Sequence, residues 1–188
     1  MPARRLRAPT DPVTALSALR PRPAIPADAA GVMVLHASVV AEGRWLLASP
    51  DEPAPSLEHW RARIADPRGV CLVLALGPRV LGWAQILPGP YRRVLHVGHL
   101  EVYLGLEARG GGHGRLLLEA ALSAAGAHPT LEKVSLSVRA DNTRAIHLYE
   151  ALGFVLEGRR RGEIREGELR LDDLLMARWL RSETGLAF

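Results

Sequence analysis

Long apolar runs, cysteine and lysine are all scarce in this sequence of 188 residues. No apolar run reaches the roughly eighteen residues that a membrane-spanning helix needs, and no apolar signal core follows the basic N-terminus. The single cysteine, Cys71, excludes a disulfide within the chain, and its apolar surroundings indicate a buried, reduced thiol and not a nucleophile. These absences predict a soluble cytoplasmic protein that does not enter a membrane.

Metal-binding patterns are absent as well. A zinc site usually needs several cysteines, or two histidines one helical turn apart, and the sequence has one cysteine and no His-x-x-x-His pair. We therefore predict no metal site.

The positive charge is carried almost wholly by arginine, because Lys133 is the only lysine and the net charge is +4. A basic balance can indicate nucleic-acid binding, but these arginines are dispersed and have no aromatic residues between them. A small polyanionic ligand, such as a phosphorylated cofactor, suits the charge equally well. We therefore disfavour nucleic acid as a partner, and also a polycationic substrate.

Periodicity and capping residues predict one mixed α/β domain over residues 13–182, after a disordered tail at 1–12. Predicted helices cover 27–41, 57–65, about 112–126, and 141 or 142 to 153. Predicted strands cover 13–20, 70–76, 80–87, 95–104, 133–139, 154–158 and 169–179. A charged loop, residues 159–170, is expected between the last two strands.

A glycine-rich loop separates the predicted strand 95–104 from the helix that follows. It contains Gly110, Gly111, Gly112 and Gly114. The free N–H groups at a helix N-terminus and the helix dipole favour an anion, and glycine lets the backbone approach it closely. Arg109 and Arg115 flank the loop and can add charge-assisted hydrogen bonds. We therefore predict an anion site here.

Two common nucleotide-binding patterns do not fit this loop. The P-loop pattern needs a lysine after its last glycine, and none follows Gly114. The dinucleotide pattern G-x-G-x-x-G also fails, because Arg115 and Leu117 stand where glycine is required. What the loop matches is Arg-x-x-Gly-x-Gly, at Arg109, Gly112 and Gly114.

A second motif lies in residues 136–158. Asn142, Ala145 and Tyr149 fall on one face of the predicted helix, and Leu152-Gly153-Phe154 leads into the next strand. An ordinary amphipathic helix with Tyr149 in the core would give the same spacing. The occurrence of both motifs in one chain is much more specific than either alone.

With these two motifs the chain resembles the GNAT superfamily of acyl-CoA-dependent N-acyltransferases. Residues 93–104 and 172–177 are most similar to the branch with bacterial L-amino-acid N-acetyltransferases. The resemblance implies a GNAT-like mixed, mostly antiparallel central sheet flanked by helices, with a splayed strand pair that holds the cofactor. It also implies acetyl-CoA as co-substrate and a small-molecule amine as acceptor, and it leaves a homodimer open.

The resemblance further assigns the coenzyme A contacts. The glycine loop would bind the pyrophosphate, with His113 over it, and the backbone of the preceding strand would hold the pantetheine and polarise the thioester carbonyl. The implied cofactor-binding residues are Val102, Tyr103, Leu104, Arg109, Gly110, Gly111, Gly112, His113, Gly114, Arg115, Asn142, Ala145 and Tyr149.

Acetyl transfer from a thioester to an amine needs a neutral amine, a stabilised oxyanion and a donor to the leaving thiolate. We expect Tyr149 to donate to the departing sulfur. The candidate bases are His96, His99 and Glu101. His99 and Glu101 share one face of their strand and His96 lies on the other. Many family members carry a glutamate near the position of His96 or His99, so the choice of base stays open.

The expected activity is therefore acetyl transfer to a small primary amine, such as that of an amino acid, by direct attack in a ternary complex. Two alternatives remain: a protein N-terminal acetyltransferase, and a non-catalytic acyl-CoA-binding domain, which Tyr149 and the strand histidines argue against. The acceptor is expected to be chosen around His36, Glu42 and Trp45 and by the segment 157–173.

Overall fold

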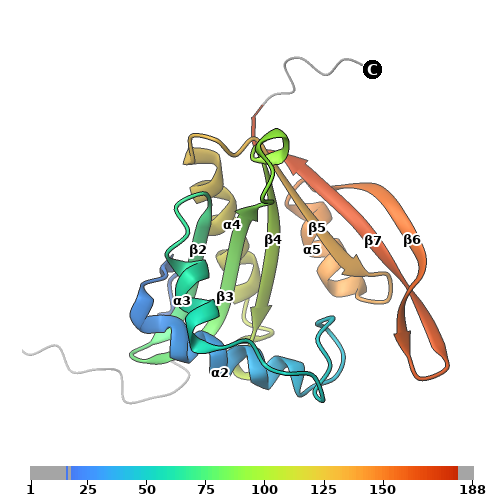
Figure 1. Ribbon diagram of the computed structural model, residues 1–188, viewed down its shortest axis with the longest axis horizontal. Coiled ribbons are helices and arrows are strands. Elements are labelled where there is room, and N and C mark those ends of the chain that lie inside the picture. Colours follow the sequence, from blue (N-terminus) through green and yellow to red (C-terminus); the bar gives the residue numbers. More distant parts are fainter. Residues whose placement is uncertain (1–15, 17, 182–188) are drawn as a thin grey trace, which may run out of the picture.

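The computed structural model describes residues 16 and 18–181. Its centre is a seven-stranded sheet in the order β1-β2-β3-β4-β5-β7-β6, which is antiparallel except for the pair β4 and β5 (Figure 1). The strands are β1 Arg22–Pro23, β2 Val70–Leu76, β3 Arg79–Pro88, β4 Val97–Leu104, β5 Lys133–Arg139, β6 Val155–Glu166 and β7 Leu169–Trp179.

In the described part of the chain, four α-helices of eight or more residues flank the sheet, and short 3-10 turns join some of the elements. The helices are α2 Ala29–Val40, α3 Leu57–Ile64, α4 His113–Ala127 and α5 Thr143–Ala151; the 3-10 turns are η1 Pro26–Asp28, η2 Arg92–Val94 and η3 Leu106–Ala108. None of the described helices is both long and apolar enough to cross a membrane.

Most of the expected elements are confirmed within one or two residues, and local chemistry explains several of their ends. Ser56 accepts a hydrogen bond from the backbone N–H of His59 at 3.1 Å and so caps α3. Asn142 caps α5 in the same way, through the N–H of Ala145 at 3.2 Å. Gly153, with φ of +82°, follows α5 where a left-handed residue ends a helix.

Three expectations about strands were wrong. The first strand was expected at 13–20, but residues 18–20 are not extended, 13–15 and 17 lie outside the described residues, and the strand that pairs with β2 is Arg22–Pro23. Residues 159–166 are not a loop, because β6 continues to Glu166 and pairs with β7 up to Glu166↔Leu169. His96 lies in a turn before β4 and not on the strand. The expected tail, 1–12, lies outside the described residues.

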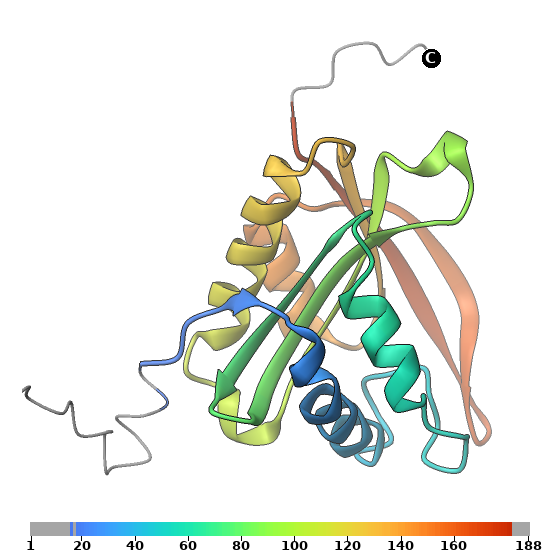
Figure 2. The same cartoon turned by 60° about the vertical axis from the view of Figure 1, so that its left-hand side comes forward.

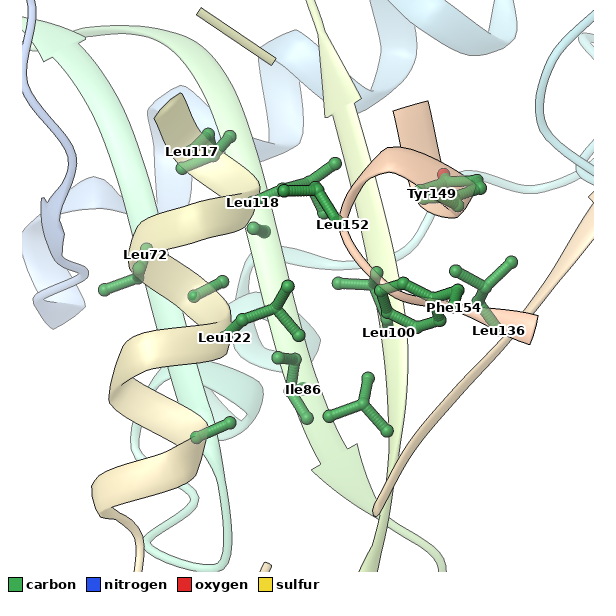
Figure 3. Close-up of a cluster of buried hydrophobic side chains, with 14 of the residues drawn as sticks. Leu72, Ile86, Leu100, Leu117, Leu118, Leu122, Leu136, Tyr149, Leu152 and Phe154 are labelled. Atoms are coloured by element: carbon green, nitrogen blue, oxygen red, sulfur yellow. The ribbon is translucent and has the colours of Figure 1, made fainter. Parts of the chain in front are cut away.

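The helices cover the two faces of the sheet in pairs, with α2 and α3 on one side and α4 and α5 on the other (Figure 2). Each face has its own hydrophobic core. Beneath α4 and α5 the core includes Leu100, Leu117, Leu136 and Phe154, and Figure 3 shows these side chains together. Beneath α2 and α3 a second core is built around Trp60, Trp83 and Tyr103.

The parallel pair β4 and β5 separates partway along its length. Its register runs Val97↔Lys133, Gly98↔Val134 and His99↔Ser135 and then stops, although β4 continues to Leu104 and β5 to Arg139. The two strands diverge beyond this point, and β5 continues its pairing with β7 instead (Figure 1). The expected splayed strand pair is thus confirmed.

Candidate active site

The divergence of β4 and β5 leaves backbone groups of β4 without a strand partner. The N–H of Gly105 donates to the carbonyl of Leu81 at 3.0 Å, which fixes the side of β4 that faces β3. Because successive peptide groups point to opposite sides of a strand, the N–H groups of Val102 and Leu104 point toward the gap. These two N–H groups, which have no strand partner among the described residues, can therefore donate to an extended ligand in the gap.

The glycine loop lies directly after β4 and ends at the N-terminus of α4. Gly110 and Gly112 adopt φ of +89° and +80°, a conformation that side chains with a Cβ rarely take. The first helical hydrogen bond runs from the N–H of Leu116 to the carbonyl of Gly112, so the N–H groups of residues 113–115 have no acceptor within the helix. The loop and helix thus form an anion-binding geometry.

Two side chains of this loop, Arg109 and His113, are bonded to other parts of the chain. Arg109 donates to the carboxylate of Glu42 at 2.6 and 2.7 Å and to the carbonyl of Leu104. The two ring nitrogens of His113 lie 3.1 Å from the carbonyl oxygen of Ala108 and 2.9 Å from that of Leu16. Arg115 is exposed and pairs with Glu119.

Helix α5 brings Tyr149 against the same gap from the side of α4. Tyr149 is 9% exposed, and its ring lies 5.7 Å from the ring of Phe154, in the same core as Leu100 and Leu136 (Figure 3). Burial raises the pKa of Tyr149 to about 12. No described residue forms a hydrogen bond with its hydroxyl. Tyr149 is therefore a protonated donor at neutral pH, with its hydrogen bond available to a ligand. Ala145 packs against the core beside it.

The three candidate bases lie in different surroundings. Glu101 projects toward the α2 and α3 face, where its carboxylate accepts from Arg63 at 2.9 Å and from Gln85 at 2.5 Å, and it stays 34% exposed. His99 is exposed and lies 2.9 Å from the hydroxyl of Ser135, at the last paired position of β4 and β5. The carbonyl of His96 accepts from the N–H groups of Glu132 and Lys133, where β5 begins.

Sequence reasoning named His36 and Tyr103 separately but missed the polar and aromatic cluster that they form beside Glu101. The side chains that compose it are His36, Trp60, Trp83, Gln85 and Tyr103, with ring centroids 5.1 to 5.9 Å apart. Four buried polar atoms among the described residues lack a hydrogen-bond partner, and all four belong to this cluster. The atoms are Trp60 Nε1, Trp83 Nε1, Gln85 Oε1 and Tyr103 Oη.

Such atoms usually bind water or a ligand group. Burial lowers the pKa of His36 and raises the pKa of Tyr103, so both are neutral near pH 7. The sequence did contain a signal for this cluster. Trp83 and Gln85 are two residues apart on one predicted strand, and Glu101 and Tyr103 are two apart on the next, so each pair lies on one face of its strand.

Two other features are separate from Tyr149 and the candidate bases. A cavity of about 550 Å³ lies between α2, the β2–β3 turn and η3, and its lining includes Glu42 and Gly105 but neither Tyr149 nor Glu101. Cys71 is mostly buried and its Sγ donates to the carbonyl of Arg63. Burial raises its pKa to about 12, which agrees with the expected unreactive thiol.

A splayed parallel pair with free backbone donors, a helix N-terminus at its open end and a buried tyrosine between them form a geometry that suits an extended, anionic ligand. Comparison with known proteins agrees with this class. A model of the acetyltransferase (GNAT) family matches residues 39–154, and the chain belongs to that family.

Relatives and solved structures support the same family. A mycothiol acetyltransferase from Kineococcus radiotolerans is 36% identical over 145 residues, which are 71% of this chain and 41% of that protein. The chain thus spans about two-fifths of the length of this curated relative. A GNAT-family acetyltransferase from Streptococcus pneumoniae superposes with a TM-score of 0.79 at 28% identity, over 86% of this chain and 99% of that one.

The fold is also similar to YncA, a putative acetyltransferase from Salmonella typhimurium solved with its cofactor acetyl-CoA. The TM-score is 0.78 at 18% identity, over 90% of this chain and 98% of that chain.

Proposed function

We propose that this protein transfers the acetyl group of acetyl-CoA to the primary amine of a small molecule, with an amino acid as the first acceptor to test. The observation that carries the proposal is the opening of the β4–β5 pair beyond His99↔Ser135, with the N-terminus of α4 at the open end, near Leu104. An extended thioester with a pyrophosphate at one end matches that arrangement of donors. Membership of the acetyltransferase family supports the same activity.

In this proposal the loop backbone from Gly110 to Gly114 and the N-terminus of α4 bind the pyrophosphate. The N–H groups of Val102 and Leu104 hold the pantetheine and polarise the thioester carbonyl. Asn142 acts by capping α5, which orients the helix that carries Tyr149. Because the N-terminus of α4 and Tyr149 of α5 place the cofactor on one side of the sheet in this proposal, the acceptor approaches from the face that carries α2 and α3.

The amine nitrogen attacks the thioester carbonyl carbon, the C–S bond breaks, and the sulfur leaves as a thiolate while the amine loses a proton. Glu101 is the favoured base, because it lies two residues past the last ladder pair, on the acceptor face, and is partly exposed. It receives the proton directly or through a water. His99 is the second choice, and His96, in the turn before β4, is the third.

Tyr149 serves as a hydrogen-bond donor to the sulfur and not as a full acid. Its pKa of about 12 exceeds that of a typical thiol, about 8.5. Complete proton transfer from the phenol to the thiolate would therefore cost roughly 5 kcal/mol. A donor aimed at the developing negative charge stabilises the transition state without that cost.

The test is release of coenzyme A from acetyl-CoA in the presence of a panel of amines. The panel holds L-amino acids, their amides, peptides with free N-termini and, because one relative is a mycothiol acetyltransferase, mycothiol that lacks its acetyl group. Transfer to peptides alone would favour the protein N-terminal activity. Tight acetyl-CoA binding without transfer to any amine would favour a binding domain, and no binding would refute the proposal.

A further inference from the structure

A short segment after α2 is bonded to both sides of the gap between β4 and β5. The Glu42 carboxylate accepts two hydrogen bonds from Arg109, at 2.6 and 2.7 Å. The same guanidinium donates to the carbonyl of Leu104, the last residue of β4, at 2.7 and 2.9 Å. On the other side, Arg139, the last residue of β5, donates to the carbonyl of Arg44 at 2.7 Å. Residues 42–44 therefore connect the diverged ends of the two strands.

Both attachments are partly or fully buried. The Arg109 and Glu42 side chains are 25% and 20% exposed, and Arg139 is 8% exposed. Arg139 is held further by Asp141, at 2.8 and 3.0 Å, and by Glu166 of β6. Two-pronged arginine–carboxylate pairs with little exposure are stronger and geometrically more specific than surface pairs.

The middle residue, Gly43, adopts φ of +63°, and its N–H donates to the carbonyl of Val40 at 2.8 Å. The segment therefore leaves α2 through one defined turn, and its position is tied to the end of that helix. A segment fixed at its origin and at both attachments can hold the strand ends at one separation.

We propose that Glu42, Arg109 and Arg139 are positioning residues that fix the width of the β4–β5 gap through residues 42–44. The inference rests on the proposed function, because the gap is the predicted pantetheine site. In this role Arg109 holds the end of β4 through its hydrogen bonds to Glu42 and to the Leu104 carbonyl. It is not a ligand of the pyrophosphate.

The two roles of Arg109 predict changes of opposite sign when Glu42 loses its charge. If Arg109 were a phosphate ligand restrained by Glu42, then Glu42→Gln would free the guanidinium and strengthen acetyl-CoA binding. If the pair fixes the gap, the same change leaves the open end of β4 unrestrained. Binding then has to order that strand end, and affinity falls.

The experiment is calorimetric titration of the wild type and Glu42→Gln with acetyl-CoA and with 3′-phospho-ADP, which lacks the pantetheine. The expected result is a loss of about tenfold in acetyl-CoA affinity and little change for 3′-phospho-ADP. Glu107→Gln is the matched control, because Glu107 also pairs with an arginine, Arg79, and within the described part of the chain forms no hydrogen bond or ion pair with residues 42–44. Thermal unfolding of each variant checks that the fold is retained.

A double variant provides a second, independent readout. Arg109→Gln combined with Glu42→Gln should weaken acetyl-CoA binding no more than the stronger single change, because the two side chains act as a unit. Unchanged or tighter binding by Glu42→Gln would overturn the inference, and so would an equal loss for 3′-phospho-ADP. Failure of the wild type to bind acetyl-CoA would instead remove the proposed function, and this inference with it.

Discussion

Tyr149→Phe separates the catalytic and structural roles of the tyrosine on α5. The change removes one hydroxyl that forms no hydrogen bond with any described residue and leaves the ring that packs 5.7 Å from Phe154. Because no hydrogen bond to a described residue is lost, we expect the free energy of unfolding to change by less than about 0.5 kcal/mol. Acetyl-CoA affinity should change by less than about twofold, since the backbone groups of the loop and of β4 remain.

Turnover should fall by about a hundredfold, which is typical for the loss of one donor to a developing negative charge. The assay is steady-state release of coenzyme A with the best amine of the panel, accompanied by calorimetric titration with acetyl-CoA. Tyr91→Phe is the control, because Tyr91 is 76% exposed and outside the site.

Unchanged turnover in Tyr149→Phe would refute the donor role, and so would a loss that only follows a lower melting temperature. The pH profile adds a further check. Since burial raises the pKa of Tyr149 to about 12, the wild type should show no alkaline loss of turnover from this group below about pH 11.

Three further sets of experiments test the loop, the base and the buried thiol. Gly112→Ala should destabilise the protein by about 1–2 kcal/mol because the φ of Gly112 is +80°. Gly126→Ala, within α4 and in open space, should instead stabilise it by about 0.5 kcal/mol. Urea titration measures both changes in the free energy of unfolding. Glu101→Gln should lower turnover by about a hundredfold with acetyl-CoA binding intact, and equal turnover would transfer the role of base to His99. Cys71 should react with iodoacetamide on the order of a thousandfold more slowly in the folded than in the unfolded chain. Its folded pKa of about 12 lies above the unfolded value, so the unfolded chain loses this proton first and stability should fall as pH rises from about 8.5 toward 12; urea midpoints of the wild type and Cys71→Ser at several pH values measure this.

The central elements could be predicted because their residues are patterned by burial and by capping. Residues 133–139 alternate polar and apolar side chains along β5, and the even-numbered ones lie in the core beneath α4 and α5. Ser56 and Asn142 indicate where α3 and α5 begin, because their side chains cap the two helices. The glycine loop was found because left-handed backbone and a helix start both favour glycine there.

The length of β6 was missed because no burial pattern accompanies it. Most of its side chains are exposed, and it is held by backbone pairing with β7 and by pairs such as Arg159 with Asp172 at 2.6 Å. The contacts of Arg109 with Glu42 and of Arg139 with Glu166 could not be predicted from the sequence either. They join residues 67 and 27 positions apart, and arginine at an anion site is expected to face the anion.

The two outer strands of the sheet have consequences for how this chain meets other chains. The edge strand β6 carries Arg159, Arg160 and Arg165 along its length, and the other edge, β1, is two residues long and ends in Pro23. Charge, brevity and proline each discourage a further strand from adding to an open sheet edge. Neither edge of the sheet is therefore suited to pairing with a strand of another molecule. Association through helices is favoured over association by strand addition.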